Sequence, residues 1–398
     1  MTEPGVTESI VPESVVADSG AVPAEPRGGS GWTRLTRDPV WIDAVLPTML
    51  LRGVFLVFAV LAVVVLRPEA LPGGSLLGIW ERWDAPHYFD IARYGYGPPS
   101  DPAFIVFFPL TPALFAIGSL FAEPLVAGMA ITFGATLASA AGLYRLIRLD
   151  AGRSTARLGV LAMSVFPTAF ALIAPYSEAV FLAFAIWSFQ LARTGRWPAA
   201  GICAFFASLA RLQGALIVPA LLLEYWLARR RVGRDAAWLL LGGGGPLVYL
   251  AINAVTFGDP FYFLAVQRDV FDHVATPPWT VLGDAFAGAM AVQPTEGWAT
   301  VYLAPFAAYV VLGLTTIWTL VSRSGRPSYA VYTGLTFLSF ATLSWPISLP
   351  RYLMGVFPIF IAAATLGRRP WLGPPIIVAS TLLFGVCLTL YVTGHWAF

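Results

Sequence analysis

Charged and aromatic side chains are concentrated in one stretch, WERWDAPHYFDIARYGYG, of an otherwise strongly apolar chain. The stretch covers residues 80–97 and places Asp84 between Arg82 and His87, with Arg93 close behind. A carboxylate in such surroundings can act as a general acid or base when it lies within hydrogen-bond reach of a group that gains or loses a proton. Charge beside lipid is costly and is usually retained for function. We therefore interpret the stretch as a functional loop and Asp84 as a candidate general base.

The aromatic residues of this stretch also have a simpler explanation. Tyr and Trp rings are enriched where a membrane meets water, so a short helix lying on the membrane surface would account for them. They are Trp80, Trp83, Tyr88, Tyr94 and Tyr96. This alternative does not explain Asp84 and its charged neighbours.

Composition indicates an integral membrane protein. Of the 398 residues, 58% are hydrophobic and 12% are charged, whereas an ordinary soluble domain carries about 25% charged residues. Cys203 and Cys387 lie in apolar segments and are interpreted as buried hydrophobic residues rather than metal ligands or a disulfide. We expect membrane lipids around the chain, no nucleic-acid partner, no cofactor and no metal site.

Two regions differ in composition. Residues 1–40 are rich in Pro, Gly, Ser and Glu without helical periodicity, which predicts a disordered tail. Residues 41–398 form the predicted transmembrane domain, and its first span, near 44–66, is interpreted as an uncleaved helix.

Topology follows from the arginines, which cluster between the apolar segments. By the positive-inside rule these clusters mark cytoplasmic loops, and the remaining connections face outward. The outward segments include the first loop, 67–103, which is expected to carry juxtamembrane helices, a long loop at 257–299, and short ones at 174–179 and 348–352.

The apolar segments predict an all-α polytopic protein with roughly eleven crossings. The segment 104–122, interrupted by Pro109 and Pro112, is expected to dip into the membrane without crossing it. The expected crossings are 44–66, 125–148, 157–175, 177–194, 197–210, 214–228, 236–256, 300–322, 328–346, 351–367 and 371–393.

Four short motifs together resemble the PIG-V-like mannosyltransferases, the family of the second mannosyltransferase of glycosylphosphatidylinositol anchor assembly. The first is RWDAPHYFDIARYGYG followed by FFPLTP, the second PYSEAVFLAF, the third ARLQG and the fourth LPRY. The elements within the first motif follow the family's order and approximate spacing, and the four motifs together spread over about 44–367. The third departs from the family pattern at Leu212 and Gln213. All 24 basic residues are arginine, which suggests a GC-rich bacterial genome. A bacterium has no such anchor to build, so the acceptor is not carried over from the resemblance to this bacterial homologue.

The resemblance implies a GT-C-type glycosyltransferase at the cell membrane with an extracytoplasmic site. Such an enzyme takes a sugar, here mannose, from a polyprenyl-phosphate donor and transfers it with inversion to a hydroxyl of a lipid or glycan acceptor, using an Asp of the first outward loop. Asp84 occupies that position. Donor or acceptor contacts are expected from Trp83, His87, Tyr88, Arg93, Tyr96, Tyr176, Glu178, Arg211, Gln213 and Arg351.

Arg351 and Arg211 suit the phosphate leaving group, whose developing charge fixed guanidinium donors would stabilise. Arg351 follows Pro350, and its own segment supplies no acidic residue, so we expect its guanidinium to be unpaired. The alternatives are that Arg351 anchors a helix end at the membrane surface and that Glu178 forms a structural salt bridge.

Two further functions remain open at this stage: transfer of a sugar other than mannose, and transport of a polyprenyl-linked lipid. A transporter should line a path through the middle of the bilayer with polar residues. Asp84, Glu178 and Arg351 are instead all assigned to the outward face.

The long outward segment 257–299 contains an apolar series near helical spacing, interleaved with charged residues. It predicts an amphipathic helix on the membrane surface. Such a helix would either wall the entry groove for a prenyl chain or simply connect two spans.

Overall fold

The computed structural model describes residues 38–71, 75–291 and 297–398, and Pro39–Phe398 forms one compact unit. In these ranges every regular element is a helix, and the extended backbone pairs only at one isolated bridge, between Ala275 and Leu343. The all-α prediction is confirmed. The tail predicted for 1–40 falls almost wholly on residues 1–37, which lie outside the described residues.

Five helical segments of the described chain are long and apolar enough to cross a membrane, and the expected crossings at these places are confirmed as helices. Each contains an apolar window of 18 residues with at most two charged side chains, and a helix satisfies its backbone polar groups internally where water is absent. They are Trp41–Leu66 (a π-helical turn and α2, Leu46–Leu66), α5 (Pro124–Arg148), Arg234–Phe257 (a 3-10 stretch and α10, Gly244–Phe257), Ala299–Val321 (a π-helical turn and α13, Ala304–Val321) and α17 (Gly373–Val392).

The other expected crossings are shorter helices, so the number of long apolar helices falls below the predicted eleven. The segment 157–175 is not one helix, and that prediction was wrong. Instead α6 (Arg153–Ser164) ends before Pro167, and a 3-10 turn, Ala169–Leu172, follows, because proline removes a helical donor and clashes with the preceding turn. The buried Arg52 of α2 donates from Nη1 to the Ala169 carbonyl at 3.2 Å, satisfying one backbone group near this break.

The segment 351–367 is also broken. Residues Leu349–Gly355, comprising α15 (Leu349–Tyr352) and a 3-10 turn, meet α16 (Pro358–Leu366) at 85°. This pair counts as a sixth crossing only if it is taken as one bent span. The bend holds Arg351 in a short helix inside the protein rather than in a continuous span.

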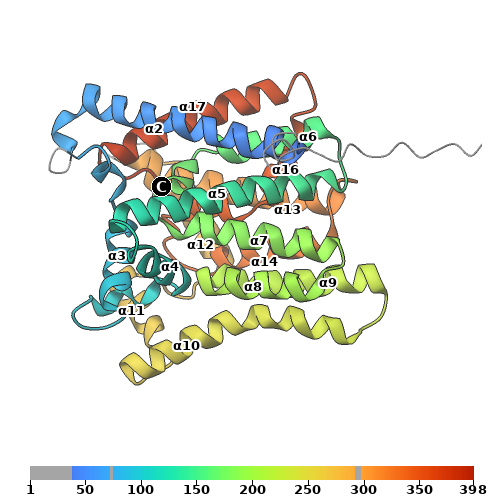
Figure 1. Cartoon of the computed structure of the whole chain (residues 1–398), viewed down its shortest axis with the longest axis horizontal. Coiled ribbons are helices and arrows are strands. Elements are labelled where there is room, and N and C mark those ends of the chain that lie inside the picture. Colours follow the sequence, from blue (N-terminus) through green and yellow to red (C-terminus); the bar gives the residue numbers. More distant parts are fainter. Residues whose placement is uncertain (1–37, 72–74, 292–296) are drawn as a thin grey trace, which may run out of the picture. The chain divides into compact units, whose positions relative to one another are not determined.

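The middle of the bundle is built around α7 (Ser177–Arg193), which is buried along most of its length. It packs between α5 and α8 (Trp197–Ala210), and Figure 1 shows the three helices running alongside one another. The helix α7 also contacts α9 (Ile217–Arg229), and α9 in turn packs against α14 (Pro327–Ala341).

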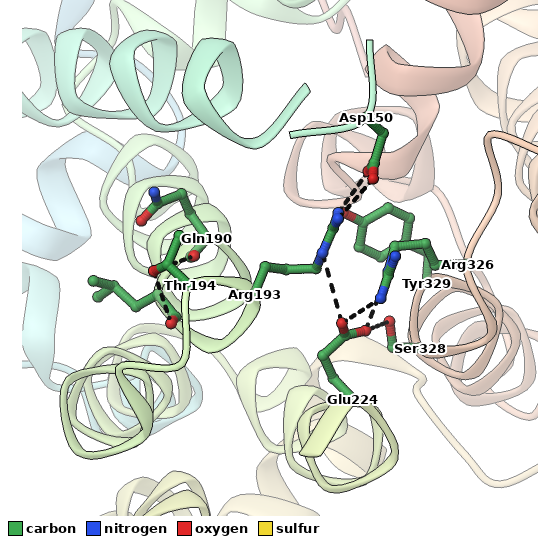
Figure 2. Close-up of polar contacts among 9 residues, drawn as sticks. Asp150, Gln190, Arg193, Thr194, Glu224, Arg326, Ser328 and Tyr329 are labelled. Atoms are coloured by element: carbon green, nitrogen blue, oxygen red, sulfur yellow. Dashed lines mark hydrogen bonds and ion pairs between the residues drawn. The ribbon is translucent and has the colours of Figure 1, made fainter. Parts of the chain in front are cut away.

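A charged cluster lies around Arg193, at the C-terminal end of α7 (Figure 2). Arg193 pairs with Asp150 through two nitrogens at 2.6 and 2.7 Å and lies 3.6 Å from Glu224 of α9. Glu224 also accepts hydrogen bonds from Arg326 and from the Ser328 hydroxyl of α14, at 2.5 and 2.6 Å. Three helices and the loop after α5 are thereby joined at one end of the bundle.

The opposite region contains the short helices of the first outward loop. As predicted, 67–103 carries a helix, α3 (Asp84–Tyr94), and the nine-residue α4 (Leu110–Gly118) is too short to cross. The helix predicted in 257–299 is present as α11 (Tyr262–Phe271) and is followed by α12 (Pro278–Ala289). In Figure 1, α3, α4 and α11 lie at the same end of the bundle, and α3 packs on α4.

Candidate active site

Asp84 is the first residue of α3 and follows a turn in which Trp83 has a φ of 55°. A positive φ is unfavourable for a bulky residue and persists only where its surroundings hold it. The Trp83 ring packs edge-on against Trp396 at 5.2 Å, and the Tyr176 hydroxyl donates to the Arg82 carbonyl at 3.0 Å. These contacts from distant segments fix the position of Asp84.

Asp84 belongs to a chain of alternating charges. Its Oδ2 lies 2.7 Å from Nη1 of Arg351, and Nε of Arg351 lies 3.1 Å from Oε1 of Glu178. The same Glu178 oxygen accepts a 2.8 Å hydrogen bond from Nη1 of Arg211. The order Asp84–Arg351–Glu178–Arg211, called the charge chain below, draws its members from α3, α15, the first turn of α7 and the end of α8.

The charge chain is enclosed in the protein. The side chains of Arg351 and Glu178 are 3% and 2% exposed, whereas those of Arg211 and Asp84 are 13% and 24% exposed. Opposite charges offset one another within the chain, which is the condition for burying them. Glu178 also lies at the N-terminal end of α7, where the helix dipole favours a negative charge. The most accessible member is the carboxylate of Asp84.

The prediction that Arg351 is unpaired was wrong. Its own segment supplies no acidic residue, but α3 and α7 supply Asp84 and Glu178. A salt bridge of Glu178, one of the two alternatives for that residue, is present. Nε and Nη1 of Arg351 nevertheless make no hydrogen bond of good geometry within the described residues. Both nitrogens face a carboxylate, so an oxyanion at the site would compete with Asp84 and Glu178 for these donors.

Aromatic rings surround the two guanidinium groups. The Cζ atom of Arg351 lies 5.0 Å from the ring centre of Tyr176 and 4.4 Å from that of Phe398, and Cζ of Arg211 lies 4.4 Å from that of Tyr352. A cation over a ring face is attracted to the ring quadrupole, most strongly where water is excluded. The fully buried Phe398 was missed by sequence reasoning; the only signal is the aromatic run around Trp396.

The remaining candidates lie beside the charge chain or away from it. The amide oxygen of Gln213 accepts from Nε of Arg211 at 3.4 Å, so Gln213 adjoins the chain. The ring of His87 lies 4.3 Å from that of Phe104, and the buried Tyr88 packs edge-on against Phe107 and Phe115.

Arg93 and Tyr96 make their contacts elsewhere. The Arg93 guanidinium lies over the ring of Tyr94, and the Tyr96 hydroxyl donates to the Phe107 carbonyl at 2.6 Å. The structure therefore brings Asp84, Tyr176 and Glu178 together with Arg211 and Arg351, but it does not place Arg93 and Tyr96 with them. Among the described residues, no three His, Cys, Asp or Glu side chains gather in a way that could hold a metal ion.

No family model and no curated protein matches the chain. Among solved structures, it is similar to the Archaeoglobus fulgidus oligosaccharyltransferase in the apo form, with 13% identity and a TM-score of 0.44, covering 86% of this chain and 56% of that one. A second structure of that enzyme, tethered with an acceptor peptide, gives 14% identity, a TM-score of 0.41, and 86% and 55% coverage. The chain spans about half the length of these structures. Similarity at this level assigns no activity.

Proposed function

We propose that the chain is a GT-C-type membrane glycosyltransferase that transfers a sugar from a polyprenyl-phosphate donor to an acceptor hydroxyl. The observation that carries the proposal is the charge chain. A carboxylate suited to accept a proton meets two guanidinium groups suited to bind a phosphate, one buried and one largely buried, in one enclosed place. The four motifs that resemble PIG-V-like mannosyltransferases supply the members of this chain.

In the proposed reaction the acceptor hydroxyl attacks the anomeric carbon and gives its proton to the carboxylate of Asp84. The bond between that carbon and the phosphate oxygen breaks, and the phosphate leaves with the bonding electrons. Arg351 and Arg211 stabilise the charge that develops on it in a site where little water competes. A single displacement of this kind inverts the configuration of the sugar.

Arg351 links the two halves of this reaction because it contacts Asp84 in the described structure. A phosphate that binds to the guanidinium competes with the carboxylate for the same donors. Donor binding would therefore weaken the ion pair between Arg351 and Asp84, and an oxygen of Asp84 would become available to the acceptor hydroxyl. Glu178 keeps Arg351 and Arg211 adjacent throughout, since one of its oxygens contacts both.

The extracytoplasmic location is likewise a proposal, and α7 supports it. Glu178 lies at one end of this helix and Arg193 at the other, about 22 Å away at 1.5 Å per residue. Arg193 belongs to the arginine clusters that the positive-inside rule assigns to the cytoplasm. The charge chain is then on the outward side, as an enzyme using a donor displayed there requires.

Mannose as the sugar rests on the motif resemblance, and a transferase of another hexose is the second form of this proposal. A lipid transporter is disfavoured because the charge chain gathers at one end of α7 instead of lining a path past both ends.

The test of the base is Asp84→Asn, which keeps the shape of the side chain and removes its proton affinity. We expect transfer from polyprenyl-phosphate-mannose to fall by about 100- to 10,000-fold. Asp90→Asn, at an exposed position of the same helix, is the matched control and should retain wild-type turnover. Turnover by Asp84→Asn within a few fold of wild type, on folded protein, would contradict the assignment. The same assay with a panel of polyprenyl-phosphate sugars identifies the sugar.

A further inference from the structure

A pocket separate from the charge chain lies between the 257–299 segment and the loop before α15. Its cavity volume is about 460 Å³, within the range of sites that hold small ligands. The polar and aromatic side chains that line it are Asp272, Thr276, Asp284, Tyr302, Ser344 and Trp345. None of these residues was predicted as part of a site.

The floor of the pocket is preformed by pairing between two segments. The Ser344 hydroxyl donates to the Asp272 carbonyl at 2.6 Å and accepts from the Val274 amide at 2.8 Å. Ala275 forms its bridge with Leu343 in the same place. The hydroxyl of Ser344 is therefore engaged within the protein, and the carboxylates and rings are the groups that remain for a ligand.

Two of those groups are presented by unusual backbone. Asp272 and Trp345 have φ values of 53° and 54°, in the left-handed region, which costs free energy for residues with a β-carbon. Trp345 is 47% exposed and stands edge-on to the ring of Tyr302, 86° apart with centroids at 6.2 Å. Together the two rings form perpendicular walls of the pocket.

Carboxylates are acceptors only, and they pair well with the donor hydroxyls of a polyol. Aromatic rings offer large apolar faces that pack against the carbon-bound hydrogens of a sugar ring. The described residues supply no ion pair to Asp272 or Asp284, so their oxygens are not already held by a cation of the protein.

The pocket is connected to the charge chain through the backbone. Trp345, Pro346 and Ile347 line the pocket, and the Leu349 amide at the start of α15 donates to the Pro346 carbonyl at 2.9 Å. The wall of the pocket thus continues directly into the helix that carries Arg351.

We propose that this pocket is a subsite for a neutral glycan portion of the acceptor. The inference rests on the proposed transferase function, because a transferase needs a hydroxyl-bearing acceptor beside its donor site. The pocket would hold sugar units of the acceptor that do not react.

Binding by the full-length protein in nanodiscs, with mannotriose as the probe, tests the subsite by saturation-transfer NMR and calorimetry. Asp284→Asn removes a charged acceptor, and Trp345→Gly removes the ring while glycine accepts the left-handed backbone without strain. We expect each change to raise the Kd for mannotriose by about 10- to 100-fold. The controls are Trp279→Ala, on the same α12 but 76% exposed and outside the pocket, and the exposed Asp235→Asn.

Asp84→Asn separates the subsite from the catalytic proposal. This variant should bind mannotriose like wild type while its transfer activity is lost. The two pocket variants, made in the protein that retains Asp84, should raise the acceptor KM and leave the donor KM unchanged. If Asp84→Asn transfers normally and the pocket variants still lose glycan binding, the proposed function fails and the subsite stands. Absence of mannotriose binding, equal binding by pocket variants and controls, or selective binding of choline or Ca²⁺ would overturn the subsite.

Discussion

Arg351 contacts two carboxylates through two different nitrogens, and this geometry distinguishes it from a simple membrane anchor. Nη1 approaches Asp84 while Nε approaches Glu178. A lysine ammonium carries the same charge at a single point and lacks the planar fork. Arg351 was expected to be available for an anion, and in the described structure two carboxylates of the protein lie against it.

Replacing Arg351 by lysine should therefore lower transfer activity by about 10- to 100-fold, through loss of the second directed contact. Replacing it by alanine should in addition lower the free energy of unfolding by about 3–5 kcal/mol, because Glu178 is left buried without this partner. Transfer rates, donor affinity and thermal melting of both variants measure these effects. Arg229→Lys, at an exposed position of α9, is the control. Equal activity of wild type and Arg351→Lys would limit Arg351 to a structural ion pair.

Close packing around α8 explains the glycine in the ARLQG motif. A β-carbon on Gly214 would lie 2.3 Å from backbone atoms of Ala207 and Ser208, so the 3-10 turn Leu212–Leu216 is pressed directly against α8. Small residues commonly permit such approach between membrane helices. Because Arg211 immediately precedes this turn, the packing also positions one guanidinium of the charge chain.

Gly214→Ala should consequently destabilise the protein by about 1–3 kcal/mol through overpacking and should displace Arg211. Gly134→Ala in α5 is the matched control, since nothing lies within 4 Å of its β-carbon position. Melting temperature and transfer rate are measured for both. If the two variants melt and turn over alike, the close approach does not constrain the site.

The helices differ in how far the sequence could predict them. Long uninterrupted apolar segments such as 44–66 and 125–148 were placed correctly because length and hydropathy suffice for a helix inside lipid. The segment 157–175 was wrongly predicted as one span. Its mean hydropathy is high enough for a crossing, but mean hydropathy does not register that Pro167 interrupts the helix. Phe398 was missed because a buried aromatic ring near a cation has the same sequence signal as any other aromatic residue.

At the scale of the whole molecule, the individual charges could be predicted but their pairing could not. Burial inside a membrane protein requires that Glu178 and Arg351 find partners, yet nothing in the local sequence says that Asp84 meets Arg351, far along the chain. Their meeting depends on the tertiary packing of α3, α7 and α15. The sidedness of the site is a separate property of the whole chain, set by the arginine clusters.

Sidedness is tested with single cysteines in a background where Cys203 and Cys387 are replaced by alanine. Cysteines at Asp101 and Ala275 should react with an impermeant thiol reagent added to intact cells, and one at Arg231 should react only after the membrane is opened. All three positions are exposed in the structure, so burial does not limit labelling. The reverse pattern would place the charge chain on the cytoplasmic side.

The two charged clusters at the ends of α7 have a mechanical consequence. Sliding this helix by one turn, about 5.4 Å, would separate Glu178 from its arginines at one end and Arg193 from Asp150 at the other. The axial register of α7 is therefore locked twice. Any opening that admits a lipid-linked substrate must then come from other elements that move past α7 while α7 keeps its axial position.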